Sequence, residues 1–344
     1  MSRARQWLVA YVLAAAVALP VAVPAADFTL QGKTVTLYAA LGLGGGGDTN
    51  ARTFLPYFAK VLPGEPSIIV KNMPGGGGIQ GVQYLYNVAP ADGTAFGLTP
   101  GGPVKEPLMG DGSKATYDLR KFHWIGSMST EDSVCAIWHA SPIKSIADAQ
   151  KNQVALAATG VSSNSTLVPI LINDLIGTKF KPISGYDGGT SLLAVERGEV
   201  DGRCMSIGAI RSARPQWLRD NQIRMILITG DSPDPEAKDV PRLTTMLKSD
   251  ADRKALEFFS MPDEIQNPLM LPPAVAPEVV SAYRHAFDQA IKNETYRAEA
   301  NRLQQNIQPH TGDEVQKTIE AMYATPKEIV DRVKRATTVK RSDK

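Results

Sequence analysis

The residues best suited to bind a ligand lie in a glycine-rich turn. Four consecutive glycines, residues 44–47, precede Asp48, and Arg52 follows four residues after that acid. Glycine lets a bound group approach the main chain closely, and free N–H groups at the start of a helix attract an anion. We expect Asp48 to cap that helix and Arg52 to pair with it. The turn therefore predicts an anion site made of Gly45, Gly46, Gly47 and Asp48. A tight turn that binds nothing is the alternative.

Polar and glycine residues follow other expected strands in the same way. A run of hydroxyl and amide side chains comes after residues 154–158, and a glycine turn comes after residues 180–183. Such groups donate hydrogen bonds to a carboxylate. The serine run could instead only cap a helix, and Tyr186 could be a core residue. Arg203 either faces this site or, as we expect, pairs with an acid such as Asp201. The remaining predicted ligand-binding residues are Thr99, Ser162, Ser163, Asn164, Tyr186, Gly188, Gly189, Thr190, Met205 and Ser206.

Strand–helix units must position these residues. Residues 34–41 predict a buried strand and residues 54–62 a helix, and further strands are expected at 67–71 and 95–99. A second glycine loop, residues 72–78, follows the second of these strands. Parallel strands present their loops, and therefore a ligand, at the carboxyl edge of the sheet.

The pattern begins again in the second half, which predicts a second α/β domain. Strands are expected at 154–158, 180–183, 199–205 and 223–229, and residues 269–271 return to the first domain. Amphipathic helices are expected at 276–291, 294–304, 312–323 and 326–336. We predict a two-domain clamshell of α/β class, each domain a mainly parallel sheet flanked by helices. Its first domain is 27–132 plus 268–344, its second is 133–267, and a hinge closes them around a small ligand.

The N-terminus indicates export. Arg3 and Arg5 precede an apolar run that ends at Pro20, and small residues follow up to residue 26. This is the pattern of a cleaved signal peptide over residues 1–26, with a retained anchor helix as the alternative. Removing it lowers the formal net charge from +2 to zero, so no basic surface argues for a nucleic-acid partner.

Several enzyme classes lack their expected residues. Residues 42–47 fit the dinucleotide motif G-x-G-x-x-G, but the next strand ends in Lys71 and Asn72 rather than the acid that binds a ribose. No G-x-S-x-G motif supplies a nucleophilic serine. The four histidines are scattered singly. We therefore expect no catalytic residue, no metal site and no cofactor, and an exported enzyme is the weaker alternative.

Taken together, five segments resemble the substrate-binding proteins of tripartite tricarboxylate transporters, the Bug receptors. The resemblance covers nearly the whole chain after the signal peptide. Gly47 stands where the family usually has Thr or Ser, Met205 stands where it has Asp, and Ala39, Ala40 and Leu43 replace an aromatic residue and prolines. The five segments are Gly44–Asp48 with Ala51-Arg52, Asn72-x-Pro74-Gly75-x-Gly77-Gly78, Pro90-x-Asp92-Gly93, Gly185–Gly189 with Gly198-x-Val200-Asp201, and Asn267–Pro273.

The resemblance implies a periplasmic receptor of the type II fold that has no catalytic activity. Such a receptor binds a small organic acid in the interdomain cleft through backbone groups and bridging waters. It then delivers the acid to the membrane permease subunits of a tripartite transporter. We expect it to act as a monomer. An exported ligand sensor that reports to a signalling partner is the alternative function.

The type II receptor topology also has a consequence for Cys135 and Cys204, the two cysteines of the chain. Their strands are antiparallel neighbours in that topology, which would bring the two Cα atoms within disulfide range. An exported location lets such a bond persist. A disulfide is therefore expected, with two buried free thiols as the alternative, because a one-residue slip in register would turn one thiol away.

Overall fold

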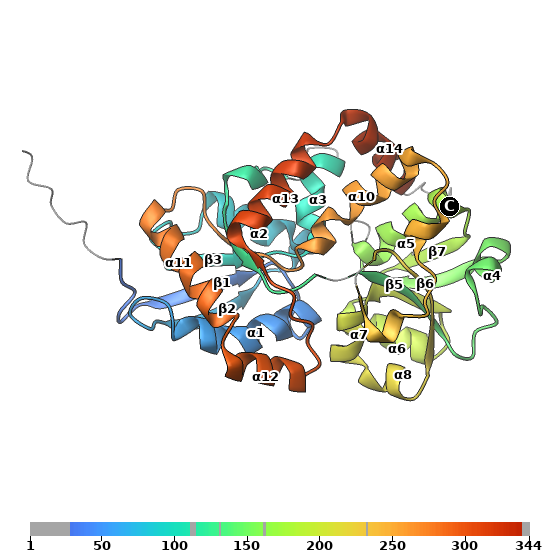
Figure 1. Ribbon diagram of the computed structural model, residues 1–344, viewed down its shortest axis with the longest axis horizontal. Helices are drawn as coiled ribbons and strands as arrows, with labels where there is room; N and C mark the ends of the chain where they lie inside the picture. The colour runs from blue at the N-terminus through green and yellow to red at the C-terminus, as the bar shows by residue number, and fades with distance from the viewer. Residues whose placement is uncertain (1–27, 111–114, 131, 161–162, 232, 339–344) are drawn as a thin grey trace, which may run out of the picture.

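A computed structural model describes residues 28–110, 115–130, 132–160, 163–231 and 233–338 of the chain. Two lobes lie side by side, each built on one β-sheet with helices on both faces (Figure 1). Lobe 1 is the lobe of the six-stranded sheet, and lobe 2 is the lobe of the five-stranded sheet. This confirms the predicted two-domain α/β clamshell fold. The expected signal peptide, residues 1–26, lies outside the described residues.

The sheet of lobe 1 has the strand order β11-β4-β10-β3-β1-β2. Strand β1 is parallel to both β2 and β3, as the strand–helix repeats predict. Strand β10 returns late in the chain and runs antiparallel between β3 and β4, so the sheet is mixed. The strands are β1 (Thr34–Ala39), β2 (Ser67–Asn72), β3 (Ala95–Leu98), β4 (His123–Ser127), β10 (Leu269–Leu271) and β11 (His310–Thr311).

The sheet of lobe 2 has the order β7-β6-β8-β5-β9. Strands β6, β7 and β8 are parallel, so the loops that follow them share one edge of the sheet. Strand β5 is antiparallel to both β8 and β9. The strands are β5 (Ser133–Trp138), β6 (Val154–Ala158), β7 (Phe180–Ser184), β8 (Gly202–Ser206) and β9 (Ile223–Ile228).

Helices cover both sheets, and the last ones span the two lobes. Helix α14 packs against α10 and α3 and also contacts α5 of lobe 2. In lobe 1 the helices are α1 (Gly46–Ala59), α2 (Ile79–Asn87), α3 (Gly101–Met109), α11 (Pro277–Ala290), α12 (Glu294–Arg302), α13 (Gly312–Ala324) and α14 (Lys327–Thr337). The others are α4 (Ile146–Lys151), α5 (Asn164–Ile176), α6 (Gly188–Glu196), α7 (Ile207–Ala213), α8 (Pro215–Arg219), α9 (Leu243–Met246) and α10 (Asp250–Glu264).

Aromatic side chains form the core of lobe 1. Phe54 and Phe58 of α1 pack against Tyr283 and Phe287 of α11 and Tyr296 of α12. All five are buried. Burial of such large apolar surfaces stabilises the fold by roughly 1.5–3 kcal/mol for each Phe side chain. This core holds α1, and therefore the glycine turn before it, rigidly against the sheet.

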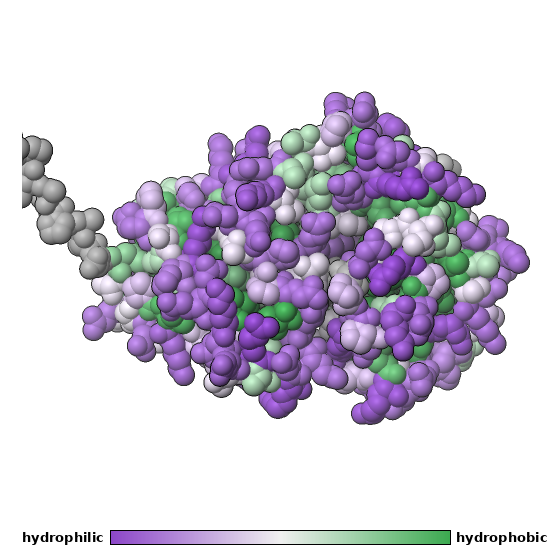
Figure 2. All heavy atoms as spheres, in the orientation of Figure 1, coloured by the Kyte–Doolittle hydropathy of each residue, from purple (hydrophilic) through white to green (hydrophobic). Residues whose placement is uncertain are grey.

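The face of the molecule shown in Figure 2 is largely hydrophilic. Hydrophilic residues cover most of the face shown in Figure 2, and hydrophobic residues are scattered among them. Among the described residues, no helix is long and apolar enough to cross a bilayer.

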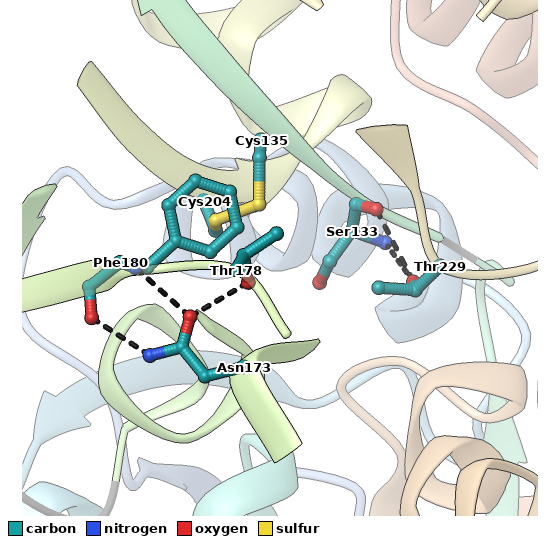
Figure 3. Close-up of a disulfide and its surroundings, with 7 residues drawn as sticks. All are labelled: Ser133, Cys135, Asn173, Thr178, Phe180, Cys204 and Thr229. Carbon is teal, nitrogen blue, oxygen red and sulfur yellow. Dashed lines mark hydrogen bonds between the residues drawn. A yellow bond between two sulfur atoms is a disulfide. The ribbon is translucent and has the colours of Figure 1, made fainter. Parts of the chain in front are cut away.

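Cys135 and Cys204 form a disulfide between β5 and β8, as expected (Figure 3). The two residues are directly opposite in the antiparallel register, with Cα atoms 4.0 Å apart. Both side chains are buried beside Phe180, on the face of the sheet that α5 covers. The register that sequence could not supply is therefore the one that brings both sulfurs to the same face.

Candidate functional site

Asp48 fixes the shape of the first glycine turn, but not as the helix cap we expected. Helix α1 begins at Gly46 with Gly45 as its N-cap, so Asp48 lies in the first turn. Its Oδ2 accepts hydrogen bonds from the Gly44 N–H at 2.9 Å and from Arg52 Nε at 2.9 Å. The expected pairing with Arg52 is therefore confirmed. The N-cap assignment was wrong because the helix starts three residues earlier than the polar pattern suggested.

Asn72, at the end of β2, completes this network. Its side-chain N–H group donates to Asp48 Oδ1 at 2.8 Å and to the Leu41 carbonyl at 3.1 Å, and its Oδ1 accepts from Arg52. Burial opposes ionisation of Asp48, but the hydrogen bonds from Arg52, Asn72 and Gly44 outweigh it and lower the pKa of this carboxyl. Asp48 is thus a buried, fully paired anion that holds the loop, and its charge is neutralised by Arg52.

The polar side chains at the start of α5 form hydrogen bonds mostly with one another and with the loop that precedes the helix. The Ser163 hydroxyl donates to the Gly160 carbonyl at 2.7 Å and lies 2.8 Å from the Ser165 hydroxyl. Thr159 N–H donates to Ser165 Oγ. Ser162 lies outside the described residues. In lobe 1, Thr99 is fully buried at the end of β3, and its hydroxyl donates to the Pro100 carbonyl at 3.1 Å.

Asn164 joins a buried ionic cluster that the sequence analysis did not find. Its Oδ1 accepts from Lys105 Nζ of α3 at 3.1 Å, and its Nδ2 donates to Asp263 Oδ1 of α10 at 2.9 Å. Lys105 Nζ also lies 3.9 Å from Asp263 Oδ1 and 3.8 Å from the centroid of the Phe259 ring. This Lys105–Asn164–Asp263 cluster connects helices of the two lobes. No helix was expected at residues 101–109, so Lys105 was not considered.

Burial controls the charges in this cluster. Desolvation lowers the pKa of Lys105, and the Asp263 carboxylate opposes that shift. Desolvation likewise raises the pKa of Asp263, opposed first by Lys105 and then by the Asn164 hydrogen bond. Each charge is therefore tolerated at this depth only because the other is present.

Two further helix N-termini face the carboxyl edge of the lobe 2 sheet. Asp187 caps α6 in a capping box with Thr190, whose N–H donates to Asp187 Oδ1 at 2.7 Å. Gly188 and Gly189 are exposed at this end of the helix. Tyr186 packs partly against the core of lobe 2.

The third N-terminus of lobe 2 is that of α7, which follows β8. The Ser206 hydroxyl caps it by accepting from the Ala209 N–H at 3.1 Å. Met205 is 8% exposed and belongs to the core of lobe 2.

The two lobes touch where these turns meet. A Cβ atom placed on Gly46 would lie 3.8 Å from Ala209 Cα and 3.9 Å from Ala209 Cβ, so the first turns of α1 and α7 are in contact. A Cβ on Gly101 would lie 3.9 Å from Asn164 Nδ2. The structure thus brings Gly46 and Asn164 to the lobe junction. The Gly188–Thr190 turn belongs to lobe 2, at the start of α6.

A small cavity adjoins the start of α7 at this junction. Its volume of about 20 Å³ is close to the space of one water molecule. Its walls come from both lobes: Thr130, Asp132, Ile207, Gly208, Arg211, Ile228, Pro233, Asp234, Asn306 and Gln308. Within the described residues, no three His, Cys, Asp or Glu side chains gather as they would around a metal ion.

Arg203 does not pair with Asp201, contrary to expectation. Asp201 accepts from the Ser141 hydroxyl at 2.8 Å and from the Ala155 N–H at 2.9 Å, so it is a structural acid. The Arg203 guanidinium instead reaches the first turn of α6. There Nη1 donates to the Gly188 carbonyl at 3.3 Å and to the Ser191 hydroxyl.

Solved structures share this arrangement of two lobes. A solute-binding protein from Polaromonas is 18% identical, with a TM-score of 0.62 over 87% of this chain and 98% of its own. MatC from Rhodopseudomonas palustris, solved with bound malate, is 19% identical, with a TM-score of 0.67 over 88% of this chain and 98% of its own. A second R. palustris protein, solved with adipate, is 16% identical, with a TM-score of 0.68 over 88% of this chain and 97% of its own. No protein of curated function is significantly similar in sequence.

The fold is therefore that of a two-domain periplasmic binding protein. Residues 57–335 match the tripartite tricarboxylate transporter family receptor, and the chain belongs to that family. This confirms the resemblance drawn from the five segments. The matched residues begin after the first glycine turn, so the family match includes Asn72 but not Asp48. Receptors of this family are periplasmic substrate-binding proteins.

Proposed function

We propose that this chain is a periplasmic receptor that binds a small organic carboxylate between its lobes and delivers it to the permease subunits of a tripartite transporter. The observation that carries the proposal is the contact of two helix N-termini, those of α1 and α7, across the lobe junction at Gly46 and Ala209. The first-turn N–H groups of a helix have no intrahelical acceptor and lie at its positive end. Two such ends from opposite lobes converge on one place, which suits an anion.

Two cations on the lobe 1 side of the junction are already paired with acids, so N–H groups are the ligand donors that this side supplies. Arg52 is paired with Asp48, and Lys105 is paired with Asp263. The residues proposed to line the site remain the predicted set: Gly45, Gly46, Gly47, Asp48, Thr99, Ser162, Ser163, Asn164, Tyr186, Gly188, Gly189, Thr190, Met205 and Ser206. Asp48 and Asn164 act in it by holding the loops, since their polar atoms already have protein partners.

The lobes are proposed to move about the two crossover segments. Ser129 and Gln266 form an isolated antiparallel bridge, and the Ser127 hydroxyl donates to the Gln266 carbonyl at 3.0 Å. Two adjacent segments joined by so few bonds make a natural hinge between residues 27–132 with 268–344 and residues 133–267. The ligand would enter when the hinge opens. Residues 1–26 are proposed to direct export and to be removed.

A thermal-shift screen tests the receptor function. The panel contains malate, succinate, citrate, adipate and benzoate, and the amide of each acid is its matched control. A specific acid at one hundred times its dissociation constant stabilises the folded state by about 2.7 kcal/mol, and its neutral amide gives a smaller shift. Equal shifts for acids and amides, or no shift from any acid, would contradict the proposal.

A further inference from the structure

Arg203 of lobe 2 is a cation that has no carboxylate partner among the residues that the structure describes. It lies near the start of β8, on the face of the sheet that α6 covers, and its side chain reaches the first turn of α6. Its protein partners among the described residues are a carbonyl and a hydroxyl in the first turn of α6, those of Gly188 and Ser191. No described acid forms an ion pair with it, whereas Arg211 and Arg214 of the same lobe both do.

The guanidinium is also incompletely hydrogen-bonded. Nε is enclosed and has no acceptor, and Nη2 has none among the described residues. Burial alone lowers the pKa of Arg203, to about 10, and no neighbouring charge contributes, so the group remains charged at pH 7. A charged, partly desolvated guanidinium without a counter-charge is costly. An anion that approaches the first turn of α6 would supply that counter-charge.

The position of Arg203 matches the proposed ligand site. Strands β6, β7 and β8 end at one edge of the sheet, and α6 and α7 both begin there. Helix α7 meets α1 of lobe 1 at this edge. The Arg203 guanidinium reaches the same edge from beneath α6, where Gly188 and Gly189 leave the helix end open to solvent.

We propose that Arg203 is a specificity-determining residue that forms an ion pair with a carboxylate of the bound ligand. This inference rests on the receptor function proposed above and adds to it the residue that recognises the carboxylate. The ligand carries an ionised carboxylate that reaches the first turn of α6, and a neutral amide at that position binds poorly. A guanidinium binds a carboxylate in a bidentate manner, with a geometry that lysine cannot reproduce.

Titration calorimetry with the acids of the panel and their monoamides tests this assignment. Loss of a charge-assisted hydrogen bond predicts that Arg203→Met weakens binding of the preferred acid by about 10- to 100-fold. Arg203→Lys, which keeps the charge, should restore part of the affinity. Discrimination between the acid and its amide should also fall in Arg203→Met, an effect that a purely structural residue would not produce.

The control variant is Arg214→Gln, which removes an arginine of lobe 2 that is already paired with Glu196. It should leave the affinity unchanged. If the wild-type protein binds an acid and Arg203→Met binds it equally well, the role of Arg203 is overturned while the receptor function stands. If the wild-type protein binds none of the acids, both proposals fail. Should Arg203→Met not fold, an unchanged affinity in Arg203→Lys together with equal binding of acid and amide by the wild type overturns the role.

Discussion

Replacing both Cys135 and Cys204 with alanine is expected to lower the free energy of unfolding by about 4 kcal/mol. The bond joins residues 69 positions apart, and closing a loop of that length removes much of the conformational entropy of the unfolded chain. Both side chains are buried, so reductant reaches them slowly in the folded protein. Urea unfolding of the oxidised protein and of the double variant measures the difference.

The matched control is the wild-type protein unfolded in reductant, which keeps both sulfur atoms but not the bond. It should lose nearly as much stability as the alanine variant. Intact mass after denaturing alkylation without reductant gives an independent check. Two added alkyl groups would show that the disulfide is absent, and a stability loss below about 1 kcal/mol would show that it does not stabilise the chain.

Asp263→Ala is expected to destabilise the protein by about 3–5 kcal/mol, because it leaves the buried Lys105 ammonium without its counter-charge. Lys105→Met in the same background should recover much of that loss, because no unpaired charge then remains. These two variants, the single variant Lys105→Met and the wild type form a double-mutant cycle. Urea unfolding of all four proteins at pH 7 measures the coupling.

Asp250→Ala is the control, because its partner Lys254 is exposed and the pair lies on the surface of α10. Its unfolding midpoint should match that of the wild type. Strictly additive effects of Asp263→Ala and Lys105→Met would contradict the cluster as a paired unit. A loss below about 1 kcal/mol in Asp263→Ala would show that Lys105 is not buried beside it in solution.

The sequence predicted those parts of the fold in which local pattern and tertiary structure agree. Strand 154–158 was placed correctly, because a short apolar run between polar loops has few other solutions. The helix expected at 276–291 was found at Pro277–Ala290, because apolar residues at helical spacing form one face of this segment. The glycine turn between β1 and α1 was predicted from the apolar strand before it and the helical pattern after it.

The features that the sequence did not predict depend on contacts between residues far apart in the chain. Helix α3 contains Pro103 and Pro107 and begins with two glycines, so its pattern is that of a loop. It forms because Val104 and Lys105 are buried against neighbouring elements. The hydrogen bond between Asp48 and Asn72 was missed because the two residues are 24 positions apart and a local pattern cannot show their contact. The opposing register of the two cysteines is likewise a property of the sheet.

The sequence predicted which loops form the candidate site, but it could not predict the hydrogen-bond partners of the residues in those loops. The glycine and hydroxyl residues at the carboxyl ends of strands indicate where a ligand could approach. Which polar atoms already have hydrogen-bond partners depends on the assembled lobes. Asn164 bonds to Lys105 and Asp263, whereas Arg203 pairs with no acid in the described part of the chain. Only the three-dimensional structure separates the groups that hold the loops from the group that still needs a counter-charge.

A crosslink across the lobe junction tests most directly whether the lobes enclose the ligand. The Cβ position of Gly46 lies 3.9 Å from Ala209 Cβ, within the range that a disulfide spans. The variant Gly46→Cys with Ala209→Cys is loaded with the acid selected by thermal shift, oxidised, and checked by mass for the new bond beside the native one. The release rate of the labelled acid is then measured with and without reductant. Enclosure predicts that release is at least about 100-fold slower in the crosslinked protein and that reduction restores it. Equal release rates before and after crosslinking would contradict a ligand held between closed lobes.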